Sequence, residues 1–199
     1  LHQDDFERAL ETIFYYRNKN IPVRYSFFLR LPQYQRTEIL KSFDKEKKYL
    51  VDIISYCLMP NHPHLLLKQR EEGGISTFMS NVLNSYTRWF NTMNERTGPL
   101  FQGKFKAIRI STDNQLIHVN RYIHLNPYSG YVVKKIADIE NYPYSSYSEF
   151  LGKKQGICDK NLVLNYFKSI TDYKKFVMDQ ADYQRKLENI KHLILEKRP

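Results

Sequence analysis

The sequence predicts an α+β protein of the ferredoxin-like (RRM-like) kind, in which helices pack on an antiparallel sheet. Apolar residues alternate along 51–59 and return along 64–69 after a Pro60-Asn61 step, which indicates two strands joined by a tight turn. Apolar side chains then recur every three or four residues over 75–93, which indicates a long helix with one buried side. Strands and helices of this size alternate in one chain, as the class requires.

The other elements follow from the same periodicities and from their end signals. They are, in order, a helix over 4–17, an extended or strand segment over 23–30, a helix over 35–47, a strand over 101–110, a helix over 113–126 that Pro127 ends, and a lysine-rich helical tail from about Asn161. We therefore expect one compact α+β domain followed by a C-terminal helical extension.

The composition indicates a polyanionic partner. The 199 residues include 31 Lys and Arg against 21 Asp and Glu, a formal net charge of +10, and the sequence pI is about 9.4. Aromatic residues make up 15% of the chain, and aromatic faces among cations can hold single strands, although most tyrosines simply pack. The two cysteines lie far apart and no apolar run is long enough to cross a membrane, so we expect a cytoplasmic protein with free thiols and no membrane partner.

Two histidines separated by one residue form the first candidate site. In a strand, the side chains of His62 and His64 point to the same face, with their Cα atoms about 6.5–7 Å apart. They are then close enough to share one metal ion, and two imidazoles leave positions open for a substrate oxygen, as a catalytic metal requires. The alternative is a turn in which the histidines only cap backbone groups.

The helix that begins after Thr112 carries the second candidate site. Gln115 completes a capping-box pattern with Thr112. His118, Tyr122 and Asn126 recur at intervals of four residues and share one side of this helix, next to its apolar stripe. Because the free pKa of tyrosine is about 10, Tyr122 needs a nearby cation to act as a nucleophile. His118 could ligate a metal or orient the tyrosine, and an ordinary solvated or core histidine is an equally good interpretation.

Together these motifs resemble the single-tyrosine HUH transposases, and within them the IS200-like group that includes the REP-associated tyrosine transposases. The resemblance runs from about Phe6 to about Phe150 and rests on Met59-Pro60-Asn61-His62-Pro63-His64, on Gly98-Pro99-Leu100-Phe101-Gln102-Gly103-Lys104-Phe105-Lys106, and on Arg121-Tyr122-Ile123-His124-Leu125-Asn126-Pro127. It implies a ferredoxin-like catalytic domain over 1–150, with a first strand upstream of Leu1, and a basic helical extension over 151–199.

The resemblance also implies the chemistry. Tyr122 would be the catalytic nucleophile, and His62, His64 and Asn126 would hold Mg²⁺ or Mn²⁺. The tyrosine would attack a scissile phosphate in hairpin-containing single-stranded DNA, in the cytoplasm and near the nucleoid. The products would be a 5′-phosphotyrosine and a free 3′ hydroxyl, from which strands can be rejoined without ATP. The sequence departs from the family at Pro63, where a larger aliphatic residue is usual, and this affects the expected metal geometry.

A basic strand is the expected DNA contact. On the strand expected over 101–110, Gln102, Lys104 and Lys106 share one face, and Arg109 and Arg121 would join them in contacting phosphates. The alternative is an ordinary half-buried strand with a solvated face.

Two other functions remain open at this point. A replication-initiator or relaxase-like nickase would use the same chemistry without strand transfer. A non-catalytic DNA-binding protein descended from such a transposase would keep the basic surface, while Pro63 would have disrupted the metal site. The sequence also leaves open whether the chain acts as a monomer or as a homodimer.

Overall fold

A computed structural model of the chain describes residues 2–195, with side chains described through residue 188. Helices and a two-stranded sheet make up these residues, so the predicted α+β class is confirmed. The chain divides into two compact units. Unit 1 comprises the residues up to Asp52 together with Leu67–Ile108, and unit 2 comprises Ile53–Leu66 together with the residues from Arg109 onward.

The predicted hairpin is confirmed. Strand β1 (Val51–Leu58) pairs with β2 (Pro63–Gln69), and the intervening turn is closed by a 3.0 Å hydrogen bond from the Met59 N–H to the His62 carbonyl. A connection this short joins only antiparallel strands. All of β1 is buried, whereas β2 is mostly exposed or half-buried. The far edge of β1 is covered because the Leu58 N–H donates to the Tyr144 carbonyl, 2.9 Å away.

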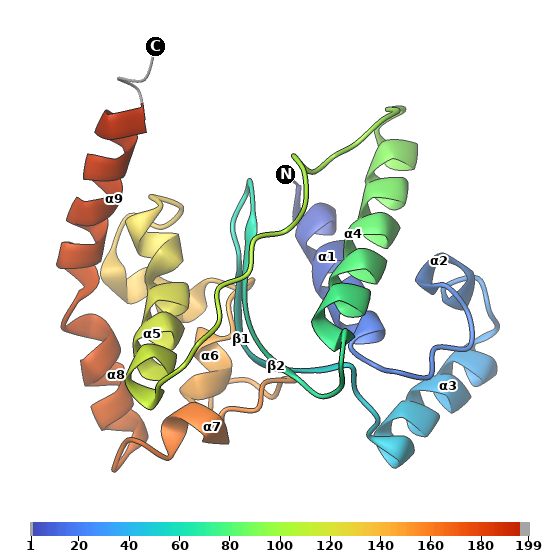
Figure 1. Ribbon diagram of the computed structural model, residues 1–199, viewed down its shortest axis with the longest axis horizontal. Helices are drawn as coiled ribbons and strands as arrows, with labels where there is room; N and C mark the ends of the chain where they lie inside the picture. Colours follow the sequence, from blue (N-terminus) through green and yellow to red (C-terminus); the bar gives the residue numbers. More distant parts are fainter. Residues whose placement is uncertain (1, 196–199) are drawn as a thin grey trace. The chain divides into compact units, whose positions relative to one another are not determined.

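Unit 1 is built on the packing of α1 (Gln3–Tyr16) against α4 (Gly74–Met93), the long helix predicted from its apolar stripe (Figure 1). Its buried side chains include Ile13 of α1 and Phe78 of α4. The guanidinium of Arg8 lies over the Tyr25 ring, with 4.3 Å from its central carbon to the ring centroid. Burial of these aromatic faces gives unit 1 a core of its own.

The segment predicted as extended over 23–30 instead contains a short helix, α2 (Tyr25–Phe28), so that prediction is wrong. Tyr25 and Phe28 are both buried, with ring centroids 5.8 Å apart. Residues three apart share one side of a helix but lie on opposite faces of a strand, so burying both rings on one side favours the helix.

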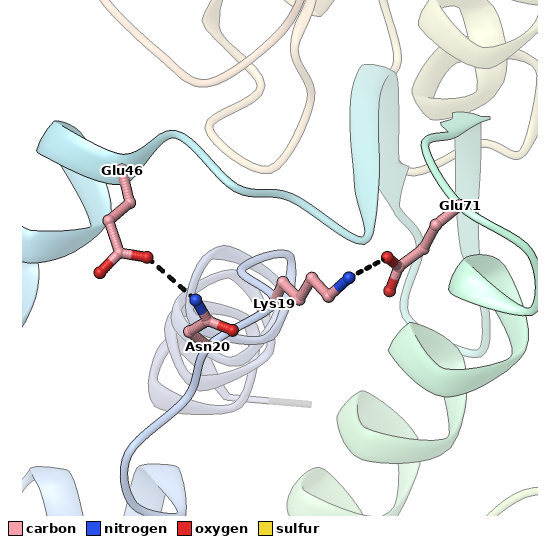
Figure 2. Close-up of polar contacts among 4 residues, drawn as sticks. All are labelled: Lys19, Asn20, Glu46 and Glu71. Atoms are coloured by element: carbon pink, nitrogen blue, oxygen red, sulfur yellow. Dashed lines mark hydrogen bonds and ion pairs between the residues drawn. The ribbon is translucent and has the colours of Figure 1, made fainter.

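Polar contacts fix the chain where α1 ends (Figure 2). Lys19 forms an ion pair with Glu71, which follows β2. The Asn20 side-chain amide donates a 2.9 Å hydrogen bond to Glu46, the last residue of α3 (Gln33–Glu46). None of the residues of α3 is buried, so the hydrogen bond from Asn20 to Glu46 helps to attach α3 to the rest of unit 1.

Unit 2 surrounds α5 (Asp113–Ser129), the helix that carries Tyr122. Its other elements, in order, are η1 (Ile136–Asn141), α6 (Tyr147–Phe150), α7 (Asn161–Leu164), α8 (Ile170–Met178) and α9 (Ala181–Leu195). Side chains of α5, α6 and α8 share one hydrophobic core with β1. The last helix, α9, packs along α5 (Figure 1), and the Gln184 amide donates to the Ser129 hydroxyl at 3.1 Å. The predicted domain boundary near residue 150 stays a prediction.

Two further predictions about elements are wrong. Residues 101–110 form no strand in the described part of the chain, and a bend at Gly103, with a φ of 78°, interrupts the alternation. Helix α5 does not end before Pro127 but continues to Ser129. A proline in the last turn removes only one helical hydrogen bond, and the Gly130 N–H still donates to the Asn126 carbonyl at 2.8 Å.

Cys57 and Cys158 are free thiols, as expected. Among residues 2–195, no helix combines the length and the apolar character that spanning a membrane requires.

Candidate active site

The turn of the hairpin brings the two predicted histidines together. His62 lies just before β2 and His64 within it, and their Nε2 atoms are 2.8 Å apart. Both side chains are accessible from solvent, since His62 is exposed and His64 half-buried. Pro63 is the first residue of β2, a position where a missing N–H is tolerated. The proline is therefore compatible with convergence of the two imidazoles.

Asn61 fixes the protonation of His62, a role that the sequence reasoning missed. The Asn61 side-chain oxygen lies 2.6 Å from Nδ1 of His62. An amide oxygen only accepts hydrogen bonds, so Nδ1 of His62 carries the proton and Nε2 of the neutral ring keeps its lone pair. Desolvation lowers the pKa of His62, and the Glu188 carboxylate partly opposes this shift. The neutral ring is thus favoured near pH 7, with its Nε2 lone pair facing Nε2 of His64.

Helix α5 places Tyr122 against this pair. Its start is fixed as predicted, because the Thr112 hydroxyl accepts a 3.2 Å hydrogen bond from the Gln115 N–H. The Gln115 side chain accepts in return from the N–H of Ser111, one residue before the cap, at 2.8 Å. The Tyr122 ring meets the His64 ring edge to face, with the centroids 5.7 Å apart. One tyrosine and two imidazoles, distant in sequence, therefore converge in unit 2.

Asn126 lies one helical turn beyond Tyr122, on the same side of α5. One turn further, a Cβ on Gly130 would lie 2.5 Å from the Met59 side chain, so this side of α5 faces the end of β1. Asn126 is buried, and its Nδ2 has no hydrogen-bond partner among the described residues. The O and N of an amide can exchange places by a flip, so the Asn126 side chain can present an unpaired oxygen at this position.

The two histidines of this site could hold a divalent cation. Two imidazole nitrogens 2.8 Å apart are close enough to be ligands of one metal ion. Within the described residues, no three His, Cys, Asp or Glu side chains gather into a metal-binding group. A third protein ligand would therefore have to be an amide, a hydroxyl or a carbonyl, and Asn126 is the amide next along the helix.

A buried chain of hydrogen bonds links α5 to β1 through His124. Tyr173 donates to the Asn120 side-chain oxygen at 2.6 Å, so its oxygen accepts from His124 Nδ1, 2.5 Å away. The Ser146 hydroxyl oxygen lies 2.8 Å from His124 Nε2, accepts from the Tyr56 N–H at 3.0 Å and donates to the Tyr56 carbonyl at 3.2 Å. Burial lowers the pKa of His124 to about 3, so the ring stays neutral. Its role is to hold α5 in place.

His118 and Arg121 bind each other rather than the histidine pair. His118 Nδ1 accepts from Arg121 at 2.6 Å, and desolvation, followed by the charge of Arg121, lowers the pKa of His118. The Arg121 guanidinium also stacks on Phe176 of α8, 4.2 Å from the ring centroid. The structure therefore gives both side chains packing partners within unit 2.

The remaining candidate DNA contacts lie on an irregular segment. Gln102, Lys104 and Lys106 are exposed residues of unit 1, and Arg109 is an exposed residue of unit 2. The prediction that they line one face of a strand is wrong, because residues 101–110 have no strand partner. Alternation of residue types alone does not supply the backbone partner that a strand needs.

Comparison with protein families identifies the chain. A family model described as "Transposase IS200 like" matches residues 27–126, which is half of the sequence and includes the hairpin and Tyr122. The chain belongs to the IS200-like transposase family. It is thus a DNA-processing protein, and its net charge of +10 suits that partner. Comparison with curated proteins found no match, and neither did comparison with solved structures.

Proposed function

We propose that this IS200-like transposase cleaves and rejoins single-stranded DNA through a covalent bond to Tyr122. The observation that carries the proposal is the contact of the Tyr122 ring with His64, whose Nε2 lies 2.8 Å from that of His62. A nucleophile beside a pair of open imidazoles is the arrangement that phosphodiester transesterification needs.

The proposed step transfers one phosphodiester bond. The Tyr122 oxygen attacks the scissile phosphorus as its hydroxyl proton leaves, and the bond between phosphorus and the 3′ oxygen breaks. The 3′ oxygen takes up a proton and departs as a free hydroxyl, while the 5′ phosphate stays on Tyr122 as an ester. A second 3′ hydroxyl can reverse the step and join new ends, so that no ATP is needed.

His62, His64 and Asn126 would hold the divalent cation, Mg²⁺ or Mn²⁺. When bound there, the cation would polarise a phosphate oxygen and offset the developing negative charge. The chain's own contribution is to hold both Nε2 atoms at one place and to fix Tyr122 beside them. The hydrogen bond from His62 to Asn61 supports the first task, and the buried chain through His124 supports the second.

Hairpin-containing single-stranded DNA is the proposed substrate, and one protomer is proposed to suffice for cleavage. Tyr122 and His64 meet within the same chain, which supports a tyrosine that serves the metal ligands of its own protomer. Arg109, Lys104 and Lys106 are proposed to contact phosphates, which positions the strand without reading its sequence.

A covalent-adduct assay tests the proposal. Labelled single-stranded hairpin DNAs are incubated with protein and Mn²⁺ and resolved on a denaturing gel. We expect a protein–DNA adduct that Tyr122→Phe abolishes and that the control Tyr34→Phe, at a residue 63% exposed in unit 1, leaves unchanged. An adduct that persists in Tyr122→Phe, or no adduct with a broad panel of hairpins, would overturn the proposal. Joining of an added 3′ hydroxyl strand separates a transposase from a simple nickase.

A further inference from the structure

Unit 1 contains a hollow of about 630 Å³ that the chemistry at Tyr122 does not use. One wall is a face of α4 that includes Ser80 and Asn84, and the other is the irregular segment after α4, including Phe101, Lys104 and Phe105. We call this hollow the α4 pocket. Its volume lies within the range of about 300–1,000 Å³ that is typical of small-molecule sites.

The two sides of α4 explain how the α4 pocket is formed. One side buries Phe78 and Val82 in the core of unit 1, and the opposite side carries the polar wall. The following segment is anchored to the helix in two places. The Asn91 amide donates to the Gly98 carbonyl at 2.8 Å, and the Phe101 ring packs 6.2 Å from the Tyr86 ring between centroids. These two contacts hold the start of this segment against α4.

The chemistry of these walls suits one nucleotide. Leu83, Phe101 and Phe105 offer apolar and aromatic surface, on which a base can stack. The Asn84 side chain, which donates to the Ser80 hydroxyl at 3.2 Å, supplies the donor and acceptor groups that read base edges. A pocket with apolar walls and a few convergent polar groups is the usual form of a ligand site.

The local charge favours a phosphate-bearing ligand. Between positions 73 and 108 the sequence holds four cations, Arg88, Arg96, Lys104 and Lys106, and a single carboxylate, Glu95. Lys104 is exposed on the pocket wall itself. Stacking surface, an amide and a cation together match the base and phosphate of a nucleotide.

We propose that the α4 pocket binds an unpaired nucleotide of single-stranded DNA. This inference rests on the proposed function in one respect, which is that the bound nucleotide belongs to DNA. A base reaches such a pocket only when it is unstacked, so the pocket distinguishes single strands from duplex. It would thus hold the substrate in unit 1 through base contacts rather than through charge alone.

Paired substitutions test the α4 pocket by DNA binding. The probe is a short fluorescein-labelled single strand of mixed sequence, measured by anisotropy in the Tyr122→Phe background, so that no cleavage occurs. We expect Phe105→Ala and Asn84→Ala each to weaken binding about fivefold or more. The matched controls are Ile108→Ala, at a residue 89% exposed on the same segment, and Asn81→Ala on the same helix. Neither control residue lines the pocket, and both should bind as the parent does.

Binding to the same sequence as a duplex completes the test. The pocket variants should bind duplex DNA as the parent does, since a paired base cannot enter. Equal single-strand affinity for all variants, or an equal loss on the duplex, overturns the proposal. Phe105→Leu keeps the apolar bulk without the ring, and its loss of single-strand affinity excludes misfolding as the cause of the Phe105→Ala result. If the adduct assay fails while these differences persist, the cleavage proposal is lost and the nucleotide site stands.

Discussion

Removing the Asn61 side chain is expected to weaken metal binding at the histidine pair. The Asn61 oxygen lies 2.6 Å from His62 Nδ1 and holds the proton there. In Asn61→Ala, the proton of the neutral ring is free to move to Nε2, the atom that faces His64. A His62 ring protonated at Nε2 has no lone pair to give a metal at that position.

The expected magnitude follows from the exposure of this contact. Loss of a group that orients a metal-binding histidine typically lowers metal affinity by about 10–100-fold. Asn61 and His62 are both exposed, so water can replace part of the lost hydrogen bond. We therefore expect the lower end of the range, about tenfold, which corresponds to about 1.4 kcal/mol.

Manganese binding measured by electron paramagnetic resonance, which reports free Mn²⁺, is the appropriate assay. Asn61→Asp keeps an acceptor for the Nδ1 proton and should retain most of the affinity. Asn165→Ala, at an exposed asparagine of unit 2, should not change it. If Asn61→Ala binds Mn²⁺ as tightly as the parent protein, the tautomer argument is wrong. If the parent protein binds no Mn²⁺, the proposal that His62, His64 and Asn126 hold a metal ion is wrong.

Three further outcomes are expected. Cleavage should be constant near neutral pH and fall in acid, because desolvation holds the pKa of His62 below its ordinary value of about 6.5 and protonation of the ring removes the ligand. An unchanged rate at about pH 5 would contradict this. Gly156→Ala should lower the free energy of unfolding, measured in urea, by about 3 kcal/mol, because the new Cβ would lie 1.9 Å from the carboxyl carbon of buried Glu149. A urea midpoint equal to that of the parent protein would refute this expectation. Ser146→Ala should lower the free energy of unfolding by about 2–3 kcal/mol and slow adduct formation, since it leaves Nε2 of buried His124 without this hydrogen bond. Equal stability of parent and variant would contradict this.

The hairpin and the start of α5 could be predicted because their signals are local. Alternation of apolar residues and the Pro60-Asn61 step specify two adjacent strands, and Thr112 with its capping glutamine specifies a helix start. The two-residue period of a strand predicted the convergence of His62 and His64, although His62 lies one residue before β2. Each of these features depends on neighbours in sequence.

The remaining features depend on partners distant in sequence. Residues 101–110 alternate like a strand, but a strand requires a partner edge, which alternation does not reveal. The helix at Tyr25 forms because Phe28 must bury on the same side, a demand of tertiary packing. The contact between Asn61 and His62 depends on side-chain rotamers, which residue order does not specify.

Three groups, Ser146, His124 and Tyr173, lie between Tyr56 and Asn120 in the buried chain of hydrogen bonds, and their chemistry has a consequence for substitution. Each of them can both donate and accept a hydrogen bond, and each contacts a neighbour on both sides. A replacement that only donates or only accepts leaves at least one neighbour unsatisfied, whatever its size. Glutamine at position 124 could in principle do both, whereas leucine of similar bulk could do neither. We therefore expect Ser146, His124 and Tyr173 to tolerate a change of side-chain volume better than the loss of a hydrogen-bond donor or acceptor.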